Sequence, residues 1–216
     1  EDVRPFLRIA HHLSDFGFSA PKIFARDEAA GLLLLEDLGD DLFARVVPQH
    51  PGLENLLYST ATSLLAELHA NPPPQNLDRY DPARMTELSA LAFDWYRTGI
   101  TGEAAPDARN RFMQRMAPAL TSHASECDVL VQRDYHAENL LWLPERSGTA
   151  RVGLLDFQDA MLVHRAYDLV SLLQDARRDV PPEIETEMLG QYVADTGVDG
   201  ERFGIAYHLL GVQRNM

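Results

Sequence analysis

The sequence predicts an α+β fold in two unequal parts, a small part that carries strands and a larger part that is mostly helical. Two observations support this. Short apolar runs of strand length occur near the start of the chain and again in its middle, where clustered polar residues border them. Longer segments with apolar residues three or four positions apart follow each group, which is typical of amphipathic helices. Strands and helices that are segregated in this way favour α+β over an alternating α/β fold.

The composition is that of a globular protein with an acidic surface. The chain has 216 residues, 45% of them hydrophobic and 24% charged, so it can bury a core of ordinary size. It carries 19 Lys and Arg against 33 Asp and Glu, which gives a formal net charge of −14. Nucleic acids and anionic membranes bind basic surfaces, so we expect neither as a partner and expect a small-molecule ligand instead.

The single cysteine and the short apolar runs indicate the cytoplasm. Cys127 has no second cysteine to pair with, which excludes an internal disulfide and a cysteine-based zinc site. No apolar run approaches the roughly 20 residues of a membrane-spanning helix, and reduced thiols are typical of the cytoplasm. The chain begins at Glu1 and ends at Met216 within an apolar helical pattern, so we expect both ends to lie inside a longer polypeptide.

The first part of the chain predicts one helix and a hairpin. Apolar residues follow Pro5 at helical spacing up to Leu13, and Gly17 ends this helix. Residues 22–25 and 32–35 predict two strands joined by a short polar connection. The acidic segment that follows breaks the pattern, so we expect a partial N-terminal part over residues 1–39 and a larger C-terminal part over residues 40–216.

The larger part contains helical segments around one group of strands. The expected helices cover residues 53–69, 83–97, 107–121, 168–177, 182–194 and 201–212. The expected strands cover residues 128–131, 140–143 and 152–155. Pro144 and Gly148 lie between the last two strands and predict a turn that joins them.

The densest cluster of polar residues, 132–139, lies between two of these strands and predicts the site of chemistry. Asp134 precedes Asn139 by five residues, and Asp156 directly follows the strand at 152–155. An Asp in this pattern faces a substrate hydroxyl, while the Asn and the second Asp hold Mg²⁺ on the phosphates of a nucleotide. Oxygen ligands of this kind are those that Mg²⁺ prefers.

The stretch from residue 129 to 178 resembles the aminoglycoside phosphotransferase/choline kinase-like family, which shares the protein-kinase fold in two lobes. The motifs Asp134-Tyr135-His136-Ala137-Glu138-Asn139, Leu155-Asp156-Phe157-Gln158-Asp159 and Tyr167-Asp168-Leu169 carry the resemblance. The residues of these motifs are most similar to those of bacterial cell-wall-recycling sugar kinases. Those enzymes phosphorylate the anomeric hydroxyl of N-acetylmuramate and N-acetylglucosamine.

The resemblance implies a role for each motif residue. Asp134 is expected to be the catalytic aspartate that orients or deprotonates the acceptor hydroxyl. Asn139 and Asp156 are expected to bind Mg²⁺, and ATP is the expected phosphoryl donor. Asp168 is expected to hold the catalytic loop from the start of a helix.

Further residues have supporting roles by the same resemblance. The backbone near Glu36 and Leu38 is expected to form the inter-lobe hinge that contacts adenine. His136 and Asp159 are expected to support the site, although Asp159 fits a simple turn or helix cap equally well.

The segment around residues 87–96 is a candidate for contact with the acceptor. Trp95 and Tyr96 are able to stack on a sugar ring, and Asp94 and Glu87 lie beside them in sequence. Several aromatics on one helix are more often packed against neighbouring helices, so both interpretations stay open.

Two departures from the family pattern leave alternatives open. The chain contains no glycine-rich phosphate loop, and its only lysine, Lys22, follows the first helix instead of preceding it. An ATP-dependent kinase of sugars or amino sugars is the leading hypothesis, with an aminoglycoside antibiotic phosphotransferase or a non-catalytic kinase-like binding module as alternatives. A metal hydrolase that uses His136 and His164 is a third.

Overall fold

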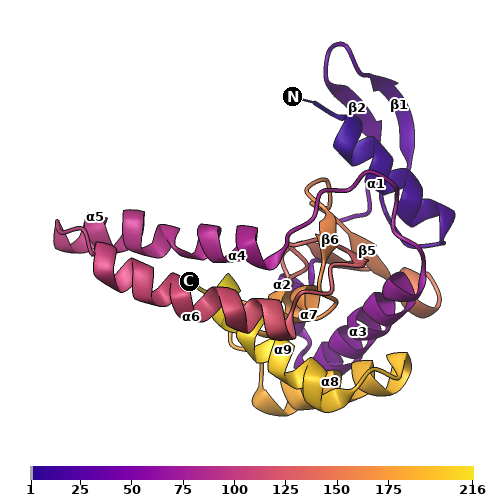
Figure 1. Cartoon of the computed structure of the whole chain (residues 1–216). Coiled ribbons are helices and arrows are strands. Elements are labelled where there is room, and N and C mark those ends of the chain that lie inside the picture. The colour runs from indigo at the N-terminus through magenta and orange to yellow at the C-terminus, as the bar shows by residue number, and fades with distance from the viewer. Residues whose placement is uncertain (1) are drawn as a thin grey trace.

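The structure is a computed structural model that describes residues 2–216. Helix α1 (Arg4–Asp15) and the hairpin of β1 (Ile23–Asp27) and β2 (Leu32–Leu35) form one end of the molecule. Helices α3, α7, α8 and α9 gather at the opposite end, and a long helical arm projects to one side (Figure 1).

Helix α1 packs its apolar face into the hydrophobic core. Pro5 occupies its first turn, where a missing N–H costs nothing, and Leu7, Ile9 and Leu13 form its buried face. The helix ends before Gly17, whose φ of +84° is in the left-handed region. The expected first helix is therefore confirmed.

Within residues 2–216, the strands form three separate antiparallel pairs. Besides β1–β2, β3 (Val129–Val131) pairs with β6 (Met161–Val163), and β4 (Leu140–Trp142) pairs with β5 (Val152–Leu154). The expected hairpin between the last two predicted strands is confirmed as β4–β5. Strand β6 was not predicted, because three residues after a turn give too little periodicity to be recognised.

Most of the remaining helices agree with the expected segments to within a few residues. Their bounds are α2 (Phe43–Gln49), α3 (Glu54–Ala70), α4 (Pro82–Ser89), α5 (Thr98–Thr101), α6 (Pro106–His123), α7 (Tyr167–Leu173), α8 (Pro182–Thr196) and α9 (Gly200–Arg214), with short 3-10 turns η1 (Pro51–Leu53) and η3 (Gly148–Arg151). Helices α2 and α5 were not predicted, and α7 ends four residues before the predicted end at residue 177. Within residues 2–216, no helix combines the length and apolarity needed to cross a membrane.

Helix α3 lies at the centre of the core. Leu57, Leu64 and Leu65 are completely buried, and α3 packs along α8 over most of its length. Polar side chains join the two helices at their rim, where Ser59 Oγ donates to Gln191 Oε1 at 2.8 Å.

The arm consists of α4, the π-helix η2 (Ala92–Arg97), α5 and α6 (Figure 1). The single helix expected over residues 83–97 is thus wrong in detail, since it divides into α4 and η2 near Ala90. Ser89 Oγ donates to the carbonyl of Met85, a contact that often accompanies bending of a helix.

Gly153 in β5 lies where a side chain has no room. A Cβ added there would be 3.0 Å from Leu141 Cβ and 3.1 Å from Leu143 Cδ1. We expect Gly153→Val to lower stability by about 1–3 kcal/mol through overpacking, measured by thermal unfolding. Gly190 in α8 is the matched control, because a Cβ meets nothing within 4 Å there. An equal loss in Gly190→Ala would contradict the packing explanation.

Candidate active site

The loop between β3 and β4, residues 132–139, is anchored by a buried carboxylate. The backbone N–H of Gln132 donates to Asp168 Oδ2 at 2.7 Å, and that of Arg133 donates to Asp168 Oδ1 at 2.9 Å. Arg133 has a φ of +74°, so the chain turns sharply at the point that these two bonds hold. The structure therefore places Asp168, in the first turn of α7, beneath the predicted catalytic loop.

Burial changes the proton affinity of Asp168. Its side chain is completely inaccessible, and this burial raises its pKa to about 7, although the two backbone N–H groups and Arg214 favour the ionised form. The carboxylate accepts a hydrogen bond on each oxygen, which only the ionised form does without rearrangement.

Asp134 is held in the loop at both its backbone and its side chain. Its carbonyl oxygen accepts from Asn139 Nδ2 at 3.0 Å and from the backbone N–H of His136 at 3.1 Å. Its carboxylate, 41% exposed, receives Arg214 Nη2 on Oδ1 at 3.3 Å. The carboxylate is thus partly open to an incoming ligand.

Asn139 and Asp156 come together from adjacent strands. Asn139 Nδ2 lies 3.4 Å from Asp156 Oδ2, and the backbone N–H of Leu155 donates to the carbonyl of Asn139 at 3.0 Å. Asp156 has a φ of +55°, an uncommon conformation for a residue other than glycine, and Gln158 Nε2 donates to its Oδ1. Strained backbone of this kind is frequent at functional sites.

The donor set at this point fits Mg²⁺. The Asp156 carboxylate and the Asn139 amide oxygen are hard oxygen donors, and a protein commonly supplies only one or two carboxylates to Mg²⁺ when phosphates and water complete the shell. In the part of the chain that the structure describes, no three His, Cys, Asp or Glu side chains are grouped to hold a metal. A phosphate-bound Mg²⁺ needs no such group.

His136 is buried behind Asn139. Its Nε2 lies 3.4 Å from Asn139 Nδ2, and its exposed fraction is 4%. Burial, together with Arg177, lowers its pKa, which favours the neutral ring. His164, the other histidine considered for a metal site, instead accepts the backbone N–H of Ala166 on Nδ1 at 3.2 Å.

The structure places the hinge residues beside the turn after β4. The backbone N–H of Glu36 donates to the carbonyl of Lys22 at 2.8 Å, and Glu36 Oε1 pairs with Arg146 at 3.1 Å. The Leu38 side chain lies close to Gly153 in β5. Asp159 is exposed near the end of the turn that follows β5.

The acceptor candidates lie on the arm. Trp95 and Tyr96 on η2 are 76% and 72% exposed, so neither is packed in a helix interface. Asp94 pairs with Arg109 of α6 at 3.0 Å, and Glu87 is exposed on α4. The structure thus leaves the two aromatic side chains open to a ligand but does not bring them into contact with Asp134.

Arg214 is a residue of the site to which the sequence assigned no role. It contacts Asp134 from 80 positions away, near the end of α9. Arg214 Nη1 also donates to the hydroxyl of Tyr167 at 3.4 Å. No local motif reveals such a contact, because it depends on how α9 packs against the loop.

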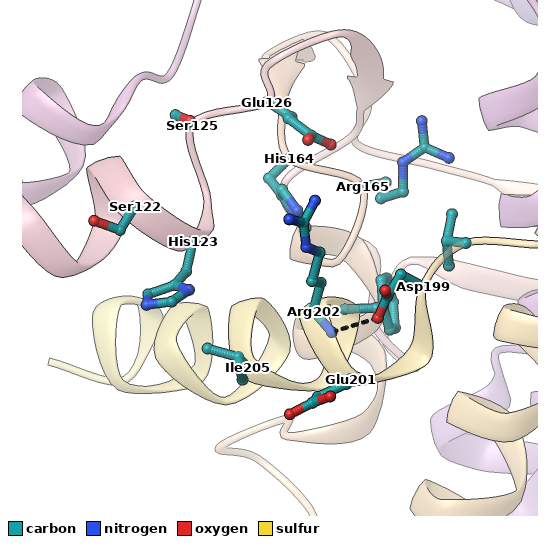
Figure 2. A pocket seen from close by; sticks show the side chains of 12 residues that line it. Ser122, His123, Ser125, Glu126, His164, Arg165, Asp199, Glu201, Arg202 and Ile205 are labelled. Carbon is teal, nitrogen blue, oxygen red and sulfur yellow. Dashed lines mark hydrogen bonds between the residues drawn. The ribbon is translucent and has the colours of Figure 1, made fainter.

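A cavity lies away from Asp134, Asn139 and Asp156. It has a volume of about 670 Å³ and is lined by the end of α6, the loop before α7 and the start of α9. Figure 2 shows His164, Glu126 and Arg202 among the side chains that line it. None of Asp134, Asn139 and Asp156 lines this cavity, and its acidic and basic side chains are mixed.

Comparison with known sequences places the chain in one family. Residues 1–205 match the family described as "Phosphotransferase enzyme family". The chain is 42% identical to an N-acetylmuramate/N-acetylglucosamine kinase of Caulobacter vibrioides, which covers 97% of this chain and 60% of the relative. It is 33% identical to the enzyme of the same name from Pseudomonas aeruginosa, with 100% and 64% covered. The chain therefore spans less than two thirds of the length of these relatives.

Solved structures show the same fold at low identity. An aminoglycoside-3'-phosphotransferase of type VIII matches with a TM-score of 0.61 and 19% identity, covering 97% of this chain and 80% of that one. A choline kinase from Streptococcus pneumoniae matches with a TM-score of 0.64 and 15% identity, covering 98% and 72%. The α+β, protein-kinase-like fold and the family resemblance expected from the sequence are confirmed: the chain belongs to the phosphotransferase enzyme family.

Proposed function

We propose that this chain provides the catalytic lobe of an ATP-dependent kinase that phosphorylates a hydroxyl of an amino sugar. The observation that carries the proposal is the convergence of Asp134, Asn139 and Asp156. The side-chain amide of Asn139 donates a hydrogen bond to the backbone carbonyl of Asp134, and its Nδ2 lies 3.4 Å from the Asp156 carboxylate. Residues 1–39 and 40–216 would be its partial smaller lobe and its larger lobe. The protein would be located in the cytoplasm, where ATP is available.

The proposed roles follow from these positions. Asp134, whose carboxylate is partly exposed, would accept a hydrogen bond from the acceptor hydroxyl and orient its oxygen for attack on the γ-phosphorus. Asn139 and Asp156 would hold Mg²⁺, which neutralises charge on the transferred phosphoryl group. Backbone at Glu36 and Leu38 would meet the adenine. Catalysis of this kind depends mostly on positioning and charge neutralisation.

The amino sugar is proposed from the sequence relatives. Four relatives that share 28–42% identity over nearly the whole chain are named N-acetylmuramate/N-acetylglucosamine kinase. The exposed rings of Trp95 and Tyr96 on the arm would supply apolar faces to a sugar. The solved aminoglycoside phosphotransferases are less than 20% identical to this chain and support the fold alone.

A panel of acceptors tests the proposal. We expect the complete polypeptide to consume ATP with N-acetylmuramate or N-acetylglucosamine and not with kanamycin or choline, and to lose this activity when EDTA removes divalent ions. Turnover with kanamycin alone would identify an aminoglycoside phosphotransferase. Mg-ATP binding without turnover on any acceptor would indicate a binding module, and zinc-dependent activity without ATP would indicate a hydrolase.

A further inference from the structure

We propose that Arg214 is a positioning residue that fixes the orientation of the Asp134 carboxylate and ties it to the base of the helical arm. The inference rests on the proposed function, in which Asp134 faces the acceptor hydroxyl. It concerns a residue at the end of α9 that is remote from the catalytic loop in sequence.

Among the described residues, Arg214 is the one side chain that forms a hydrogen bond or an ion pair with the Asp134 carboxylate. Its Nη2 donates to Oδ1 at 3.3 Å, while the Asp134 backbone carbonyl is engaged by the loop itself. A carboxylate has two oxygens, so this contact leaves Oδ2 for the acceptor. A carboxylate without such a partner would rotate about its side-chain bonds, and the loss of a single orientation is costly to a reaction that depends on alignment.

Arg214 is itself held in place. Its guanidinium lies over the Tyr167 ring at 5.5 Å from the centroid, and its side chain is only 18% exposed. Although burial opposes a charge, the pKa of Arg214 lies above its usual value because Tyr167 and Asp134 stabilise the cation. A planar, permanently charged group that spans both partners is the kind of contact for which arginine is suited and lysine is not.

Gln213, the residue before Arg214, connects α9 to the arm. Gln213 is 5% exposed, and its Nε2 donates to the hydroxyl of Tyr80 at 2.9 Å and to Ser89 Oγ at 3.3 Å. Ser89 is the last residue of α4, the first helix of the arm. The Tyr80 ring packs edge-on against Tyr167 at 5.7 Å.

These contacts form a continuous network of side chains from the first helix of the arm to Asp134. Gln213 binds Tyr80 before α4 and Ser89 at the end of α4, and Arg214 binds Asp134. The rings of Tyr80 and Tyr167, which pack against each other, join the two sets of contacts. Two consecutive residues of α9 therefore bind α4, which precedes the η2 segment that carries Trp95 and Tyr96, and the aspartate that would orient the acceptor. A displacement of the arm root relative to α9 would be transmitted to the Asp134 carboxylate.

The test compares Arg214→Ala and Arg214→Lys with Arg202→Ala in the complete polypeptide. Arg202 lies at the opposite end of the same helix and is exposed, so it is the matched control. We expect kcat to fall roughly 100-fold in Arg214→Ala, as for misplacement of a reacting group by about 1 Å, with the KM for ATP unchanged. Added guanidinium should restore part of the kcat lost in Arg214→Ala. The kcat of Arg214→Lys should lie between those of Arg214→Ala and the wild type.

A second measurement does not depend on turnover. Melting temperatures of Arg214→Ala, Asp134→Asn and the double variant form a cycle, and we expect the double variant to lose less than the sum of the single losses. Wild-type kcat in Arg214→Ala would overturn the proposal. The proposal would also be overturned if the melting shifts of Arg214→Ala and Asp134→Asn add in the double variant and, in addition, neither added guanidinium nor the Arg214→Lys substitution recovers any of the lost kcat. If the wild-type protein phosphorylates no acceptor, the proposed function fails, while the cycle still decides whether Arg214 holds Asp134.

Discussion

Asp156→Ala should abolish phosphoryl transfer, with kcat reduced by about 1,000-fold or more. Asp156 would supply the charged oxygen ligand to Mg²⁺, and the Asn139 amide 3.4 Å away is neutral and does not replace it. Loss of charge neutralisation at the transferred phosphoryl group removes the largest contribution to catalysis in this class. The measurement is ATP consumption with the best acceptor of the panel at saturating Mg²⁺.

The matched control for this variant is Asp195→Ala, which removes an exposed carboxylate of α8. Its kcat should equal that of the wild type. Asp156 is also exposed, so its removal leaves no buried group unpaired and the melting temperature should change little. Wild-type turnover in Asp156→Ala would refute the assignment of the metal site.

Asp168→Asn should cost both stability and activity, and the loss of stability should depend on pH. An amide keeps one acceptor oxygen, so either Gln132 or Arg133 loses the bond that its N–H makes to Asp168. A buried N–H without a partner costs about 1–3 kcal/mol. The loop that carries Asp134 would loosen, and we expect kcat to fall roughly 100-fold.

The sign of the pH dependence follows from the raised pKa. Asp168 has a folded-state pKa of about 7, above its ordinary value of 3.8, so the folded state binds the proton more tightly than the unfolded state. The wild type therefore loses stability from this group as the pH rises from about 4 to about 7. The amide introduced by Asp168→Asn does not titrate, so the destabilisation that this substitution causes should be larger at pH 5 than at pH 8.

Thermal unfolding of both proteins at the two pH values measures this difference. Asp199→Asn is the control, because Asp199 accepts the backbone N–H of Arg202 at 3.0 Å in an exposed N-cap of α9. Its effect on the free energy of unfolding should be small, about 1 kcal/mol or less, and equal at pH 5 and pH 8. A pH-independent loss in Asp168→Asn would show that burial does not perturb this carboxyl.

The sequence predicted the elements whose pattern is local. The helix at α3 and the hairpin β4–β5 have clear periodicity or a turn signal between two apolar runs. The motif that contains Asp134 and Asn139 is likewise local, because five residues separate the two side chains. Its geometry follows from one loop between two strands.

The sequence did not predict what depends on tertiary packing. Strand β6 is stabilised by its pairing with β3, about 30 residues earlier, and three residues have no periodicity of their own. The division between α4 and η2 arises where the arm leaves the core, although the propensity of the segment is helical throughout. Arg214 reaches Asp134 only because α9 packs beside α7.

The exposure of the arm offers a route to altered ligand selectivity. Every residue from 91 to 115 is at least partly exposed, and of the hydrophobic side chains in this distal part of the arm only Phe112 packs against the buried core. Substitutions there change the surface offered to a ligand with little effect on folding, as for surface positions in general. The acceptor contacts proposed for Trp95 and Tyr96 therefore lie in a segment that contributes little to the core, so the distal arm is a natural segment to exchange when chimeras with altered selectivity are built.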